Sequence, residues 1–316
     1  MSKLKKIKTK ILIKEFPKKF YLNFKNEKFK YSDYLNLSSK RIREIKYRNR
    51  EIKKWVNKIK NQLKSNNPAI LIDLNKSLQS DDDKISNFRL FNIFLTIFFG
   101  EVLVQDEKKN KVITVYDRDK RKTMKRGARY HQTHEGGSIH TDNVNIPEYW
   151  DFLIFSCVSQ SPIGGNSLIV DGKIIYNVLK KKFPNILKTL MKNFWFEKRG
   201  LGNSCFKSPI ISIRNKNVRY RYLRNYLESA HKKKKDFLSS NQIKALDRLD
   251  SLLENRTYQK KFKMKKYQIL ITQDSRILHG RTSFVDHKNA VPLDKYNPLK
   301  KQHIKRTMDR VWIREK

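Results

Sequence analysis

The stretch GGSIHTDNVN, from Gly136 to Asn145, places a histidine and an aspartate two residues apart, shortly after two glycines. Residues two apart on a β-strand point to the same face, so we expect His140 and Asp142 to project side by side. An imidazole and a carboxylate are two of the three ligands of the 2-His-1-carboxylate triad, which holds iron(II) and leaves coordination positions open. Such pairs also arise by chance, so the motif needs a third ligand elsewhere in the chain.

Short strands are expected on both sides of this stretch. Segments rich in β-branched and aromatic residues predict strands at 112–116, 152–158, 166–172, 209–213 and 268–273. Helical patterns interrupt them at 174–194, with a break at Pro184, and at 240–262. Many short strands with a helical insertion predict a mainly β fold with accessory helices, built on an antiparallel barrel or jelly roll.

The first part of the chain has a different pattern. Residues 1–37 alternate basic and apolar positions and are expected to form an irregular or strand-bearing arm. A helical pattern then runs from Ser39 to Leu63, with apolar residues at steps of three and four. Residues 66–74 predict a turn followed by a buried strand, and the apolar window from Phe88 predicts a buried helix ending near Gly100.

These patterns divide the chain into two predicted regions. We predict a basic N-terminal arm and helix at 1–64, packed on the core, and a jelly-roll domain at 65–316. The helical insertion of that domain is expected at about 174–262.

The chain is strongly basic, with 72 Lys and Arg against 30 Asp and Glu and a formal net charge of +42. Such a balance favours nucleic acid, anionic membrane surfaces or acidic small molecules as partners. Lys, Asn and Ile are all frequent, however, and an A/T-rich genome imposes the same bias, so the charge alone is weak evidence for a nucleic-acid partner.

The cysteine content and the apolar segments point to a cytoplasmic protein. The two cysteines, Cys157 and Cys205, fit a reducing compartment and exclude a disulfide framework or a four-thiolate zinc site. The apolar run at 11–13 is too short for a signal peptide, and no window is long and apolar enough to predict a transmembrane helix.

A third metal ligand has to come from one of the other histidines. His279 is the best placed, because it follows the predicted strand at 268–273 and precedes a glycine that permits a close turn. His131 and His134 offer a competing three-histidine cluster with His140, but we expect them in a polar loop over the mouth of the site. Three histidines in lysine-rich surroundings are predicted to lie at the surface, namely His231, His287 and His303.

These motifs resemble the taurine dioxygenase family of iron(II)- and 2-oxoglutarate-dependent oxygenases, whose relatives include the gamma-butyrobetaine and trimethyllysine hydroxylases. Four blocks in the family's order carry the resemblance, which covers roughly residues 65–316. It implies a double-stranded β-helix core, the jelly roll of the cupins, and a requirement for Fe(II), 2-oxoglutarate and O2. The blocks are GGSIHTD (136–142), SPIGGNSLIVDGKIIYNVL (161–179), DSRILHGRTSF (274–284) and KRTMDRVWI (305–313).

The resemblance also implies roles for single residues. His140, Asp142 and His279 fall on the iron ligands of the family. Arg306 falls on the arginine that binds the distal carboxylate of 2-oxoglutarate, which suits a planar guanidinium because its fork pairs with both oxygens. Ser167 falls where these enzymes often have a threonine hydroxyl that supports the same carboxylate.

The last block raises two further expectations. About 26 residues separate Arg306 from the third ligand, more than in the close relatives, so a loop over the site is expected at 286–303 and Arg281 is the alternative. Arg310 lies four residues past Arg306 and matches the arginine that meets the anionic end of the substrate in taurine dioxygenase, although a salt bridge explains it equally well. Trp312 is interpreted as the packing residue of the strand.

The resemblance implies a dioxygenase that acts on an unactivated C–H bond of a small, anionic or amino-acid-like substrate and releases succinate and CO2. Asp142 favours hydroxylation over chlorination, because halogenases of the group replace this carboxylate. Gly136 stands where taurine dioxygenase has a substrate-binding side chain, which argues against taurine. Desaturation, cyclisation or epimerisation stays open, as it depends on substrate placement.

Two functions of other classes also stay open. One is a non-catalytic basic jelly-roll scaffold that binds nucleic acid or a partner, and the other is an oxygenase that acts on a macromolecule. The salt dependence of binding distinguishes nucleic-acid binding from a small-molecule enzyme, because binding to a phosphate backbone weakens steeply as the salt concentration rises.

Overall fold

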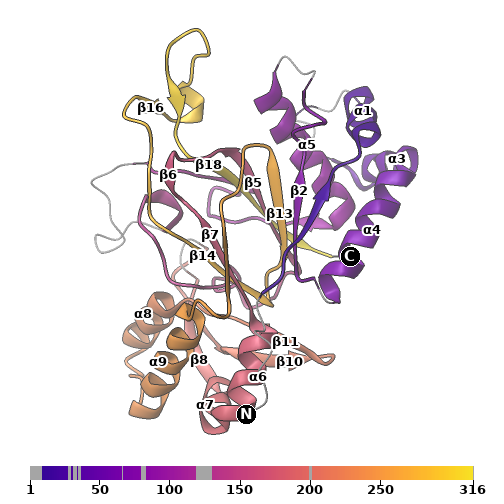
Figure 1. Cartoon of the computed structure of the whole chain (residues 1–316). Helices are drawn as coiled ribbons and strands as arrows, with labels where there is room; N and C mark the ends of the chain where they lie inside the picture. Colours follow the sequence, from indigo (N-terminus) through magenta and orange to yellow (C-terminus); the bar gives the residue numbers. More distant parts are fainter. Residues whose placement is uncertain are drawn as a thin grey trace, which may run out of the picture.

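Two β-sheets form the centre of the protein in this computed structural model, which describes residues 9–27, 30, 34, 37–65, 67–79, 83–118, 130–198 and 201–315 (Figure 1). The large sheet has the strand order β1-β2-β13-β5-β18-β3, with β4 also paired to β18. Its strands are β1 (Leu12–Glu15), β2 (Ala69–Asp73), β3 (Glu101–Val102), β4 (Val112–Val115), β5 (Phe152–Ser159), β13 (Gln268–Gln273) and β18 (Thr307–Arg314).

The smaller sheet packs against the inner face of the large one. It has the order β12-β7-β14 and is antiparallel throughout. Ile169 and Ile277 of this sheet share a hydrophobic cluster with Leu270 and Met308 of the large sheet, so the two sheets enclose a common interior. The strands are β7 (Ser167–Asp171), β12 (Gln259–Phe262) and β14 (Ile277–Arg281). A short pair is formed by β6 (Ile163–Gly164), which precedes β7, and β15 (Phe284–Val285), which follows β14.

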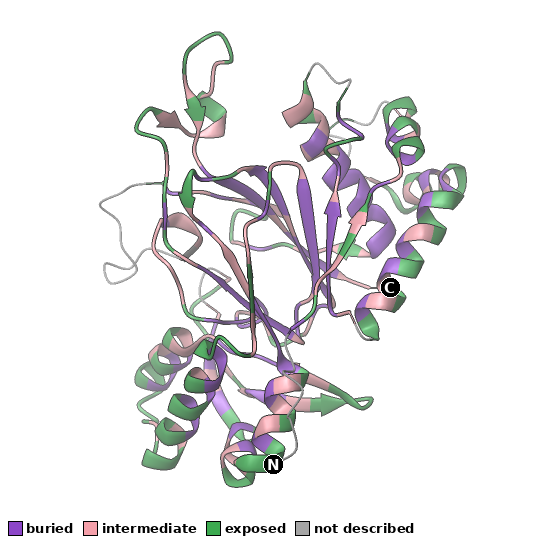
Figure 2. Cartoon of the chain, in the orientation of Figure 1, coloured by how far each residue is buried: buried purple, intermediate pink, exposed green. Residues whose placement is uncertain are grey.

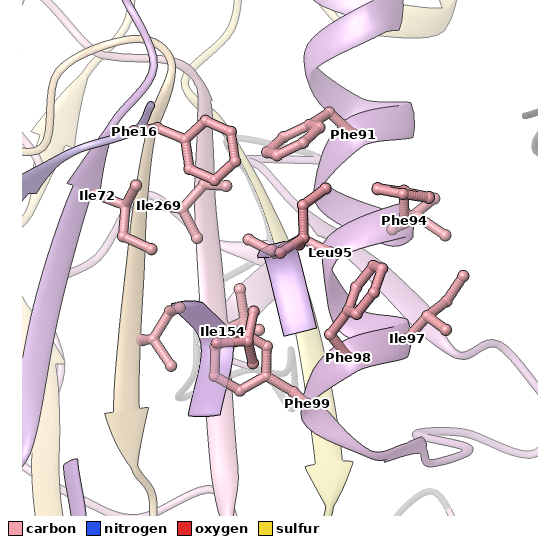
Figure 3. Packing of buried hydrophobic residues seen from close by; sticks show 14 of the residues in the cluster. Phe16, Ile72, Phe91, Phe94, Leu95, Ile97, Phe98, Phe99, Ile154 and Ile269 are labelled. Atoms are coloured by element: carbon pink, nitrogen blue, oxygen red, sulfur yellow. The ribbon is translucent and has the colours of Figure 1, made fainter. Parts of the chain in front are cut away.

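The central strands of the large sheet, such as β5 and β13, are buried on both faces, as their colouring in Figure 2 shows. Along β13, Ile269 and Ile271 belong to an outer cluster with helix α5, whereas Leu270 belongs to the interior between the sheets. This alternation is the period of two that a strand imposes. Figure 3 shows Ile269, Ile154 and Ile72 on the sheet facing the phenylalanine-rich helix.

The N-terminal helices cover the outer face of the large sheet (Figure 1). Helix α5 is buried on nearly all sides, because the sheet covers one side and the other three helices cover the rest. Phe91 of α5 contacts the rings of Phe16, Tyr21 and Phe24 at 4.8 to 5.5 Å between centroids. The helices are α1 (Lys18–Asn26), α3 (Ser39–Arg48), α4 (Arg50–Lys64) and α5 (Lys84–Phe99).

The helical pattern from Ser39 to Leu63 forms two helices and not one. The break falls at Asn49, whose ψ of 47° leaves the helical region. Its side chain donates to Glu27 at 2.7 Å and to the carbonyl of Ile45 at 3.0 Å. The helix is interrupted at this buried amide, which instead bonds to α3 and to the end of α1.

A separate hydrophobic cluster joins the insertion to the small sheet. The insertion contains strands beside its helices, so the helices predicted to reach Phe194 and Phe262 end earlier, and those two residues lie on strands. Its elements are α6 (Gly172–Lys182), α7 (Pro184–Leu190), β8 (Asn193–Glu197), β9 (Cys205–Pro209), β10 (Ile211–Arg214), β11 (Asn217–Tyr220), α8 (Arg224–Lys234) and α9 (Ser240–Glu254).

The mainly β fold with accessory helices is confirmed, including the buried helix before Gly100. The division at residues 64 and 65 stays a prediction. Within the described part of the chain, no helix combines the length and apolar character that crossing a membrane requires.

The contact between α5 and the large sheet should be a main source of stability. Leu95 is fully buried in it, so Leu95→Ala should lower the free energy of unfolding by about 3 kcal/mol in a urea titration. Leu22→Ala is the matched control, because Leu22 lies on a helix but is 53% exposed, and its cost should stay below about 0.5 kcal/mol. Equal losses in both variants would show that the helix contributes little through burial.

Candidate metal centre and co-substrate cavity

The two histidines of the predicted triad lie opposite each other on neighbouring backbone segments. His279 is on β14, and His140 forms an isolated antiparallel bridge with it. The N–H of His140 donates to the carbonyl of His279 at 2.9 Å, and the N–H of His279 donates to the carbonyl of His140 at 2.7 Å. The imidazole centroids are 4.6 Å apart as a result.

Asp142 reaches the same place without lying on a strand. Strand pairing ends at His140, and Asp142 lies in the bend that follows. The bend is held from the insertion: the N–H of Thr141 donates to the carbonyl of Tyr222 at 2.8 Å, and the N–H of Tyr222 donates to the Thr141 hydroxyl at 2.9 Å. The expectation of one strand carrying both ligands was therefore wrong, because tertiary hydrogen bonds orient the carboxylate.

The three side chains have the geometry of a metal site. The Nε2 atoms of His140 and His279 each lie 3.8 Å from Oδ1 of Asp142, and the ligand atoms all lie within 4.8 Å of one another. Nitrogen and carboxylate ligands bind at about 2.0–2.2 Å, so two ligands of one ion lie at most about 4.4 Å apart, a limit that both 3.8 Å separations from Asp142 meet. The donor set therefore fits a single divalent ion, with imidazole and carboxylate ligands suited to iron(II).

The protonation states also suit a metal. Burial lowers the pKa of both imidazoles, to about 3 for His279. Burial would raise the pKa of Asp142, but the guanidinium of Arg310 and other neighbours outweigh this effect and bring it to about 2. Neutral imidazoles and an ionised carboxylate are the forms that bind a metal. The contact of His140 Nδ1 with the Ser138 carbonyl, 2.8 Å long, leaves Nε2 as the ligand nitrogen.

Strand β18 directs two donors at Asp142. Nη1 of Arg310 lies 3.2 Å from Oδ1 and 3.1 Å from Oδ2, while its Nε donates to Oε1 of Gln105 at 2.9 Å. The indole N–H of Trp312 donates to Oδ2 at 3.1 Å. The salt-bridge interpretation of Arg310 is thus observed, and its role toward a substrate stays a prediction. The donor role of Trp312 was not foreseen.

A second buried acid, Asp274, stands behind the triad. Its Oδ1 accepts the backbone N–H of Asp142 at 3.3 Å. Burial, and then the negative charge of Asp142, raise the pKa of Asp274 well above its usual range. Asp274 therefore anchors the bend through this hydrogen bond, a role that the sequence motif around it did not reveal.

A cavity of about 60 Å³ adjoins the triad and brings together the residues predicted for 2-oxoglutarate. Ser167 on β7 is paired in register with Arg281 on β14, and Arg306 completes the polar lining beside His279. Both arginines thus line one cavity, although the sequence treated them as alternatives. Arg281 donates to the carbonyl of Thr133, which holds its guanidinium at the wall.

Arg306 is held in this cavity by its neighbours. The guanidinium carbons of Arg306 and Arg281 lie 5.1 and 4.9 Å from the ring centroid of Phe284. The backbone N–H of Arg306 donates to the carboxylate of Asp286 at 2.7 Å. Gly165 has a φ of +66°, and a Cβ there would lie 2.9 Å from Nε of Arg306, so a glycine is needed for the arginine to lie this close.

A much larger open cleft of about 1890 Å³ reaches the triad from the other side. It shares His131, His140, Asp142 and Arg310 with the small cavity, so these residues stand between the two spaces. The segment 286–303 contributes to the wall of the cleft. It carries β16 (Ala290–Val291) and η3 (Leu293–Lys295), and it ends at the start of β17 (His303–Ile304).

The remaining histidines differ in their environments. His131, in the short helix η2 (Tyr130–Gln132), borders the site, and His134 lies 3.6 Å from Asp117; neither belongs to the metal-ligand group found among the described residues. His231 was wrongly predicted to lie at the surface. It is buried on α8, where its Nε2 accepts the N–H of Trp195 at 3.1 Å. His287 and His303 are exposed, as predicted.

Known proteins similar to this chain share its architecture. An asparagine oxygenase solved with Fe(II), 2S,3S-3-hydroxyasparagine and succinate superposes with a TM-score of 0.65 at 10% identity, covering 95% of this chain and 93% of that one. The non-haem iron oxygenase OrfP, solved with Fe and alpha-ketoglutaric acid, has a TM-score of 0.65 at 10% identity and covers 97% and 95%. These likenesses confirm the jelly-roll fold.

Sequence comparison gives a curated relative and a family. FR-33289 synthase of Streptomyces rubellomurinus (strain ATCC 31215) is 21% identical over 199 residues, which is 61% of this chain and 57% of that protein. The chain thus spans little more than half of this relative. The family described as taurine catabolism dioxygenase TauD, TfdA family matches residues 79–308, a range that includes the triad, Ser167 and Arg306. Since this match spans most of the chain, the protein belongs to the TauD, TfdA family of dioxygenases.

Proposed function

We propose that the protein hydroxylates an unactivated C–H bond of a small amino-acid-like substrate in a reaction that converts 2-oxoglutarate to succinate and CO2. Its class follows from its family, whose enzymes are Fe(II)- and 2-oxoglutarate-dependent dioxygenases. The observation that carries the proposal is the buried group of His140, Asp142 and His279 beside a cavity lined by arginines. Bound iron, with 2-oxoglutarate and O2, supplies the oxidising power for this chemistry.

The residues of this chain have distinct roles in the proposal. His140, Asp142 and His279 hold the metal, and the buried walls around them limit access of water. Arg306 pairs with the distal carboxylate of 2-oxoglutarate through its planar fork, and the hydroxyl of Ser167 supports the same group. Ser167 lines the small cavity from β7 and Arg306 from the residue just before β18, so together they fix the orientation of the co-substrate.

The substrate enters from the large cleft in this proposal. Charged groups of both signs line that cleft, among them Arg89, Asp106 and Asp294. An amino acid carries both signs of charge as well, so its two ends find complementary partners there. Arg310 borders the cleft next to the triad and would meet an anionic group of the substrate. The solved relatives point the same way, with hydroxyasparagine in one and hydroxyarginine in another.

Anaerobic titration of the purified protein with Fe(II) and then 2-oxoglutarate tests the proposal. A weak visible charge-transfer band should form only after both additions. His279→Ala should weaken Fe(II) binding by more than about 100-fold, beyond what loss of an outer partner causes, because it removes one of three ligands. His287→Ala serves as the control, since this exposed histidine lies outside the triad. A folded wild-type protein that forms no band would refute the catalytic assignment.

The assignment of Arg306 is testable by replacing its planar guanidinium with the ammonium group of a lysine. Arg306→Lys keeps the positive charge but loses bidentate pairing, so the 2-oxoglutarate concentration that half-saturates the band should rise about tenfold. Arg281→Lys is the matched comparison from β14 in the same cavity, with an expected change of less than about threefold, because Arg281 is already bound to a backbone carbonyl. The reverse order of effects would transfer the role to Arg281.

A further inference from the structure

The two carboxylate oxygens of Asp142 lie in different environments. Oδ1 faces the triad, 3.8 Å from Nε2 of His140 and 3.8 Å from Nε2 of His279. Oδ2 accepts the indole N–H of Trp312 at 3.1 Å. Nη1 of Arg310 is nearly equidistant from the two oxygens, so it balances their charge without distinguishing between them. The indole is therefore the donor that makes the carboxylate asymmetric.

The indole that makes this bond is itself fixed. Trp312 stacks on Trp150 with ring centroids 4.2 Å apart and an interplanar angle of 18°, and each residue is only 1% exposed. Leu153 of β5 packs in the same cluster and pairs in register with Trp312. Rotation of the Trp312 side chain would break this packing, so its N–H is held in one direction.

The neighbouring guanidinium is also fixed, by Gln105. Its Oε1 accepts Nε of Arg310 at 2.9 Å, while its Nε2 donates to the carbonyl of Lys111 at 2.7 Å and to that of Arg310 at 2.9 Å. Asp142 is thus approached by two donors that have little freedom to move. Outer partners of this kind orient metal ligands and contribute to metal affinity.

We infer that Trp312 is a positioning residue of the metal centre: its indole N–H retains Oδ2 of Asp142, so that Oδ1 alone faces the two imidazoles. The inference rests on the proposed metal-binding function of the triad. A carboxylate held in this way presents one oxygen to the ion and leaves the other coordination positions to co-substrate and dioxygen. Stacking of the indole alone would not require this N–H.

The test compares two tryptophan variants of the full chain by Co(II) titration, followed by absorbance. Trp312→Phe removes the donor to Asp142. Trp150→Phe makes the same chemical change in the same stack, but Nε1 of Trp150 has no hydrogen-bond partner among the described residues. The two variants therefore lose similar stacking. They differ in the bond to Asp142 and in the contact with the guanidinium of Arg310, which lies 4.9 Å from the centroid of the Trp312 ring. Circular dichroism and thermal unfolding establish that each is folded.

The expected result is a loss of Co(II) affinity of about tenfold in Trp312→Phe and less than about threefold in Trp150→Phe, with a changed visible spectrum of bound Co(II) only in the former. Equal affinities and spectra in the two variants would overturn the inference. If the wild-type protein itself binds no Co(II), the proposed function fails and not merely the role of Trp312.

A subtler replacement covers the case in which Trp312→Phe does not fold. Benzothienylalanine at position 312 keeps the two fused rings and replaces the indole N–H by sulfur, so packing on Trp150 is retained. Co(II) affinity should again fall by about tenfold, since only the donor is lost. Unchanged affinity in this folded variant would overturn the inference.

Discussion

The reciprocal backbone hydrogen bonds between His140 and His279 are the constraint on which the site depends. Antiparallel residues that exchange both bonds have their Cα atoms about 5.5 Å apart and their side chains on one face. This pairing brings the loop before β5 onto β14 and sets both imidazoles over the interior between the sheets. The bend bound by Tyr222 and Asp274 then brings Asp142 to the imidazoles, and donors on β18 orient its carboxylate.

Strand β18 connects this centre to the rest of the fold. Its inward residues Arg310 and Trp312 contact Asp142, whereas its outward residue Asp309 accepts two hydrogen bonds from Arg89 of α5. The register shifts between Thr307 and Met308, just after Arg306, as bulges beside active sites commonly do. The N-terminal helices thus contact the strand whose side chains orient Asp142. A change that loosens this helix packing is therefore expected to disturb the geometry of the metal site as well.

The sequence predicted the strands and the grouping of the site residues better than it predicted the local backbone and the burial around them. The motifs located His140, Asp142 and His279 because residue types at short spacing carry that signal. The bend at Asp142, the break at Asn49 and the burial of His231 depend on partners far along the chain, which a local pattern does not contain. Trp312 was the nearest miss: its spacing of two from Arg310 places both on one face of β18, and only the direction of its N–H was unknown.

The charge of the site can be separated from the charge of the chain. The small cavity is lined by three guanidinium groups, those of Arg281, Arg306 and Arg310, against the single ionised carboxylate of Asp142. The lining of the cavity is therefore positive before any metal binds. A dianion such as 2-oxoglutarate matches that field, and its attraction is strengthened by burial. These buried groups account for anion binding at the centre, so the excess of surface lysines that gives the chain its +42 charge is not needed for it.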